Sequence, residues 1–148
     1  MGTILSELVH NQVLRVSLLA WLLAQGLKGI HSVIKERRLN FRRFVGAGGM
    51  PSSHSAFVTS LATAIGLTEG WETTTTALAI VFAFIVMYDA SGVRRAAGKQ
   101  AQVLNKIVDE FYQEGHVRED RLKELLGHTP VEVIAGALLG IVMAVLLL

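Results

Sequence analysis

Four stretches of the chain are apolar on nearly every helical face, and more polar segments separate them. They cover residues 13–34, 53–67, 74–88 and 131–148. Each approaches the length of about 20 residues with which a helix crosses the hydrocarbon core of a bilayer. No segment of the sequence alternates apolar and polar residues as the strands of a membrane β-barrel do. The pattern therefore predicts an all-α polytopic membrane bundle with about four transmembrane helices, formed by residues 1–148 as a single domain.

Small residues distinguish the second apolar stretch from the others. Ser55, Ala56, Ser60 and Gly66 are typical of it, whereas large aliphatic and aromatic side chains dominate the other three stretches. Small residues let membrane helices approach closely and hydrogen-bond across the contact. We therefore expect the second stretch to be an inner helix that the longer, more apolar helices cover.

A polar segment at residues 98–127 separates the third and fourth stretches. In its first half, Ala101, Leu104 and Ile107 recur at intervals of three, while Lys106 and Asp109 fall on the other side of such a helix. This spacing predicts an amphipathic helix on the cytoplasmic side that lies on the membrane or on the bundle.

The composition agrees with a membrane protein. Apolar residues make up 51% of the chain and charged residues 18%, against about 25% charge in soluble domains. The sequence contains no Cys, which excludes Cys-ligated zinc, iron–sulfur clusters and a cysteine nucleophile. Its basic residues stand between apolar runs and not among the stacking aromatics of nucleic-acid-binding surfaces, so we expect no nucleic-acid partner.

The basic residues also predict an orientation. They cluster at 35–43, after the first stretch, and at 94–99, after the third, whereas the turn between the second and third stretches carries only Glu69 and Glu72 as charged groups. By the positive-inside rule, both basic loops face the cytoplasm and both termini lie outside a cell membrane that the chain crosses several times.

Residues suited to phosphate chemistry gather at the expected cytoplasmic ends of the helices. If the helices bundle, the segments 35–43, 46–55, 89–99 and 127–132 meet at one level of the membrane. Arg and Lys side chains suit phosphate oxygens, and the glycine-rich start of the second helix offers backbone N–H groups to an anion. The set therefore indicates a phosphate site.

Two histidines in these segments could act in acid–base or nucleophilic chemistry. His54 and His128 each stand at the start of an apolar stretch. Glu132 follows His128 by four residues and lies on the same helical face, where it could orient the imidazole. The sequence has no HExxH motif, no carboxylate cluster and no P-loop, so we expect no metal or other cofactor.

Structural interpretations of the same residues remain open. Residues 129–132 also form a capping box with proline at its first helical position. Residues 51–53 are an ordinary helix start, and the basic cluster at 37–43 could serve only to anchor the topology. Asp89 could cap a helix or pair with Arg94.

Three motifs resemble the signatures of the type 2 phosphatidic acid phosphatase and vanadium haloperoxidase superfamily. Lys35 and Arg42 have the spacing of its first signature, Pro51-Ser-Ser-His54 is similar to the second, and His128 with Glu132 is similar to the end of the third, with Glu in place of Asp. The strings GGMPSSHSA, DASGVRRAAG and GHTPVEV resemble the small divergent integral-membrane branch of this superfamily.

The resemblance implies a metal-independent phosphatase that hydrolyses a lipid phosphate, such as a phospholipid or a prenyl pyrophosphate. His128 would attack phosphorus and form a phosphohistidine, Glu132 would orient it, and His54 would protonate the leaving oxygen. The implied phosphate ligands are Lys35, Arg42 and the backbone near Ser52 and Ser53.

The sequence departs from the superfamily pattern at one charged position. Leu122 stands where the third signature has its arginine, and we expect Arg94, Arg95 or Lys99 to supply that charge. The sequence predicts four spans, whereas typical members of the superfamily have six. A homo-oligomer, in which a partner subunit helps to close the site, therefore remains open. The alternative hypothesis is a non-catalytic membrane protein that binds anionic lipid or acts as an assembly partner.

Overall fold

The computed structural model describes residues 2–36, 49–111 and 127–148, and all the regular structure in these ranges is helical. The expected all-α membrane bundle is therefore confirmed. The helices are α1 (Gly2–His10), α2 (Gln12–Glu36), α4 (Ser53–Glu69), α5 (Thr74–Ser91), α6 (Val93–Phe111) and α7 (Pro130–Leu147).

Three regions of the described chain are long and apolar enough to cross a membrane. They are Gln12–Ile34 in α2, Thr74–Val108 in α5 and α6, and Pro130–Leu147 in α7. The fourth expected span is α4, which has 17 residues and is shorter than the usual length of about 20. Large apolar side chains on α5 and α7 are exposed, among them Leu78, Phe84 and Leu146, as expected for surfaces that face lipid.

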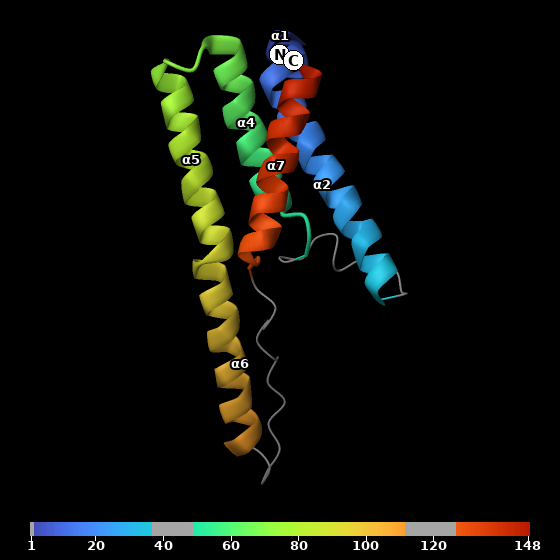
Figure 1. The fold of residues 1–148 in the computed structure, drawn as a ribbon, viewed down its shortest axis with the longest axis vertical. Helices are drawn as coiled ribbons and strands as arrows, with labels where there is room; N and C mark the ends of the chain where they lie inside the picture. Colours follow the sequence, from blue (N-terminus) through green and yellow to red (C-terminus); the bar gives the residue numbers. More distant parts are fainter. Residues whose placement is uncertain (1, 37–48, 112–126) are drawn as a thin grey trace.

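Helix α4 is the centre of the bundle. It packs against α2, α5 and α7 (Figure 1), and most of its residues are buried, including Ala56, Ser60 and Ala64. Thr59 Oγ1 also donates a hydrogen bond to the Ala137 carbonyl of α7, at 3.0 Å. The interpretation of the small-residue stretch as an inner helix is therefore correct, because only small side chains allow three helices to surround it.

The contact between α4 and α7 depends on two glycines of α7. A Cβ added to Gly136 would overlap the carbonyl of Ser52, and one added to Gly140 would overlap the Ala56 carbonyl and Thr59. The backbones therefore touch where these glycines lie. At the start of both helices the Ser52 N–H donates a hydrogen bond to the Glu132 carbonyl, at 3.0 Å, which holds the two helix starts at one level.

The helices alternate in direction, so that polar segments far apart in the sequence meet at one end. Both termini and the turn between α4 and α5 lie at one end of the bundle, and the starts of α4 and α7 lie toward the other (Figure 1). This arrangement agrees with termini on one side of a membrane. Which side faces the cytoplasm stays a prediction.

Helix α6 begins at Val93, earlier than the expected start at residue 98, and continues in nearly the direction of α5 beyond the other helices (Figure 1). Gly92 is in the right-handed helical region, and its N–H and carbonyl keep helical hydrogen bonds to Tyr88 and Ala96. The chain therefore does not turn back. Among the described helices α6 contacts only α5, so it does not lie along the bundle, and the other expected position, on the membrane, stays a prediction.

Candidate functional site

His128 is held just before α7 by backbone contacts on both sides. Its N–H donates to the Ala90 carbonyl near the end of α5, at 2.8 Å. The preceding Gly127 has φ +88, and a Cβ there would meet the backbone of Arg94 and Arg95. A glycine is needed at this turn because other residues rarely adopt positive φ. The result is an imidazole that is only 3% exposed.

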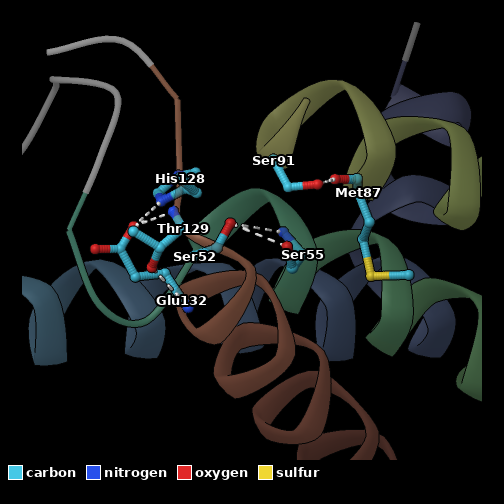
Figure 2. A network of polar contacts seen from close by, with 7 residues as sticks. All are labelled: Ser52, Ser55, Met87, Ser91, His128, Thr129 and Glu132. Atoms are coloured by element: carbon cyan, nitrogen blue, oxygen red, sulfur yellow. Dashed lines mark hydrogen bonds and ion pairs between the residues drawn. The ribbon is translucent and has the colours of Figure 1, made fainter. Parts of the chain in front are cut away.

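Glu132 contacts this imidazole and caps α7 with the same oxygen. Its Oε2 lies 3.1 Å from His128 Nδ1 and accepts the Thr129 N–H at 3.0 Å, while Thr129 Oγ1 accepts the Glu132 N–H at 3.4 Å (Figure 2). The structure therefore contains both features of the motif: the capping box is complete, and the carboxylate contacts the ring. A proton on Nδ1 that faces the carboxylate leaves the lone pair of Nε2 available.

The surroundings of His128 favour the neutral ring. Burial lowers the pKa of His128 below its usual value, and the positive charge of Lys28 lowers it further. The hydrogen bond and the charge of Glu132 raise this pKa, as does a backbone hydrogen bond at Gly49, but burial is the largest effect. A histidine nucleophile must be neutral before it attacks, so the direction of the shift suits that role.

His54 lies beside His128, although the two are far apart in the sequence. The ring centroids are 6.5 Å apart and the ring planes are inclined by 60°. His54 is the second residue of α4 and its side chain is exposed. The pair forms because the hydrogen bond between Ser52 and Glu132 joins the starts of α4 and α7.

Ser52 and Ser53 are buried where α4 begins. Ser52 is the N-cap: its Oγ accepts the Ser55 N–H at 3.3 Å and the Ser55 hydroxyl at 3.0 Å (Figure 2). Its own N–H is already bonded to Glu132. The N–H groups of Ser53 and His54 belong to the first helical turn, where backbone donors have no carbonyl within the helix, and they point to the end where the two rings lie.

Arg94 lies at the start of α6 and pairs with Asp89. Arg94 Nε is 2.7 Å from Asp89 Oδ2, and both side chains are nearly half exposed. The pairing alternative for Asp89 is thus the observed one. Arg94 also lies within electrostatic range of His54, whereas Arg95 meets Gly127 through its backbone. The Lys35 side chain, Arg42 and Leu122 lie outside the part of the chain whose placement is described.

Lys28 is a further basic residue near the two rings, and it was not among the expected phosphate ligands. It stands near the end of an apolar stretch, where lysine side chains commonly reach out to the membrane interface, but it is only 5% exposed. The sequence signal that could have identified Lys28 was a charge within an apolar helix, because ionisable residues inside membrane helices mark functional sites.

Within the described ranges, no group of three or more His, Asp and Glu residues could hold a metal ion. The side chains that meet at this end are instead two imidazoles, a carboxylate and basic groups. Such a set can transfer protons and provide a nucleophile next to positive charge.

The fold and this paired-histidine end define a multi-pass helical membrane protein with a candidate phosphate site. The sequence matches the model of the Divergent PAP2 family over residues 9–143, and the chain belongs to this family. The resemblance seen in the motifs is thereby confirmed. The chain is also 42% identical over 152 aligned residues to the Bacillus subtilis protein titled "Uncharacterized membrane protein YuiD", with 95% of this chain and 96% of the relative covered. No solved structure matches the chain.

Proposed function

We propose that this protein is a membrane phosphatase that works without a metal and hydrolyses a lipid phosphate or a prenyl pyrophosphate through a phosphohistidine. The observation that carries the proposal is the pair of rings 6.5 Å apart, one of which contacts a carboxylate at 3.1 Å. Membership of the Divergent PAP2 family supports it.

In the first step, His128 Nε2 attacks phosphorus while the bond from phosphorus to the leaving oxygen breaks. His54, in its protonated form, gives its proton to that oxygen. A nucleophile about 3–3.5 Å from phosphorus and an acid about 2.6–3.2 Å from the leaving oxygen fit two rings at this separation. The Glu132 carboxylate stabilises the positive charge that His128 acquires.

In the second step, water attacks the phosphohistidine, and neutral His54 takes the proton of that water. The phosphorus–nitrogen bond breaks, phosphate leaves and both histidines return to their starting states. Catalysis of phosphoryl transfer depends mainly on positioning and on positive charge around the equatorial oxygens. Arg94, Arg95, Lys35, Arg42 and the N–H groups near Ser52 and Ser53 are the proposed sources of these contacts.

The proposed substrates are lipids because the site lies at one end of helices whose exposed surfaces are apolar. A phosphate headgroup at the membrane interface reaches this end while its chains stay beside the helices. We propose that this end faces the cytoplasm, as the basic loops predict.

The test is phosphate release by the full chain in lipid nanodiscs with a chelator present. Phosphatidic acid and a prenyl pyrophosphate are compared as substrates. His128→Ala and His54→Ala are expected to lower kcat by about 10³-fold or more, by analogy with other nucleophile and acid–base pairs. His31→Ala is the matched control, because His31 is an exposed histidine of α2 outside the proposed site, and it should leave the rate unchanged.

A non-catalytic lipid-binding protein is the second candidate, and Leu122 at the arginine position of the third signature favours it. The two functions differ in one measurement. Wild-type protein incubated with radiolabelled substrate and quenched in alkali should retain acid-labile phosphate that His128→Ala lacks. Anionic-lipid binding without phosphate release or labelling would support the second candidate and refute the first.

A further inference from the structure

The side chain of Lys28 is buried at the end of the bundle where the two histidines meet. It is 5% exposed, although it belongs to α2, which carries neither histidine. A lysine kept away from water within a membrane helix costs several kcal/mol unless other groups stabilise its charge. Charged residues inside membrane helices face the interior of the bundle and mark functional sites, so a buried lysine at this end is a candidate for one.

Gly49 shapes the position of the Lys28 side chain. A Cβ added to Gly49 would lie 3.0 Å from Cε, 3.3 Å from Cγ and 3.6 Å from Cδ of Lys28. The lysine stem therefore runs directly over the backbone of the segment that leads into α4. Gly49 has φ +94, so both its conformation and the space above it suit glycine. The packing holds the stem in place and directs it along this segment.

The charge of Lys28 acts on both rings of the proposed site. His54 and His128 each lie within its electrostatic range. Among the basic side chains in the described ranges, the charge of Arg94 also affects His54. Unlike Lys28, however, Arg94 is nearly half exposed and is paired with Asp89. Lys28 is thus the buried positive charge common to the two imidazoles.

We propose that Lys28 is a phosphate ligand, whose ammonium group binds the non-bridging oxygens of a phosphoryl group held between His54 and His128. An ammonium is a compact charge that neutralises these oxygens, and a phosphoryl dianion is a partner that stabilises a buried lysine. The inference deepens the proposed phosphatase function and rests on it. It adds a ligand from α2 to those that the sequence motifs suggested.

Vanadate binding and phosphate release together test the proposal. Wild type, Lys28→Met, Lys28→Gln and Arg15→Met are prepared as full chains in nanodiscs. Methionine matches the length of the lysine stem, and glutamine keeps a polar end without the charge. Arg15→Met is the matched control, because Arg15 is an exposed basic residue of the same helix, about 20 Å away along its axis. Vanadate affinity is measured from the rise in melting temperature that the ion causes.

Both Lys28 variants are expected to bind vanadate about 10- to 100-fold more weakly than wild type, the range for a lost hydrogen bond to a charged group. Their kcat/KM on lipid phosphate should fall at least as much, while Arg15→Met equals wild type. Vanadate affinity within threefold of wild type in either folded Lys28 variant would overturn the proposal. If wild type binds vanadate but releases no phosphate, the phosphatase function is refuted, and the vanadate affinities of the Lys28 variants still decide whether Lys28 is a phosphate ligand. If wild type neither binds vanadate nor releases phosphate, both proposals are refuted.

Discussion

Replacement of Glu132 by glutamine separates the two contacts that this residue makes. Glutamine also serves at the third position of a capping box, and its single carbonyl oxygen can still accept the Thr129 N–H that Oε2 now accepts at 3.0 Å. We therefore expect the free energy of unfolding to change by less than about 1 kcal/mol. Glutamine is neutral, so the group that contacts His128 Nδ1, at 3.1 Å in the wild type, no longer carries a negative charge.

The expected loss of activity follows from that lost charge. A hydrogen bond to a charged group contributes about 1.5–3 kcal/mol and a neutral one about 0.5–1.5. The difference of about 1–1.5 kcal/mol corresponds to about a 5- to 10-fold lower kcat. If the amide NH₂ instead faces Nδ1, His128 takes the wrong tautomer, and the loss approaches the roughly 10⁴-fold seen in hydrolase triads with an aspartate-to-asparagine change.

The pH profile of kcat/KM is the assay that distinguishes orientation from capping. The proposed mechanism requires neutral His128 and protonated His54, so activity rises with pH through the pKa of His128 and falls again where His54 loses its proton. Glu132 raises the pKa of His128, so Glu132→Gln should move the acidic limb to lower pH while the maximum rate falls. Thr129→Ala is the matched control: it removes the hydroxyl that accepts the Glu132 N–H, costs about 1 kcal/mol of stability and should leave the limb in place.

Either of two results would refute this reasoning. If Glu132→Gln keeps kcat within twofold of wild type and leaves the acidic limb unmoved, Glu132 serves only as a cap. The same conclusion follows if Thr129→Ala moves the limb as far as Glu132→Gln does, because the effect would then come from the helix start as a whole.

Further predictions concern packing and charge. Gly136→Ala should destabilise the protein by about 1–3 kcal/mol, because backbone faces the new methyl group. Gly26→Ala, with nothing near its Cβ, should leave the melting temperature equal or higher; equal melting temperatures for the two variants would contradict the close helix contact. Phosphate release by wild type should fall with decreasing pH with a midpoint below 6.5, since burial lowers the pKa of His128. Asp89→Asn should change stability by less than about 1 kcal/mol in thermal unfolding, because its pair with Arg94 is nearly half exposed.

Local patterns in the sequence were enough to predict the fold class. Long apolar stretches predict helices in a bilayer whatever their neighbours are, because each helix satisfies its own backbone hydrogen bonds. The small residues of 53–67 likewise predicted the central place of α4. The motifs around His54 and His128 indicated the family, and the spacing of His128 and Glu132 predicted their contact because one helical turn joins them.

Tertiary structure decided which groups share one site. The two rings meet because Gly136 and Gly140 let α7 touch the backbone of α4, and helix crossing of this kind is not encoded in the period of either helix. Burial of Lys28 likewise depends on the segment at Gly49, a distant part of the chain that leads into α4. The sequence left open whether α6 lies on the membrane or on the bundle, because amphipathic spacing shows that a helix has two faces but not what lies against either. Contacts between distant segments follow from how whole helices pack, and no local pattern of residues determines that.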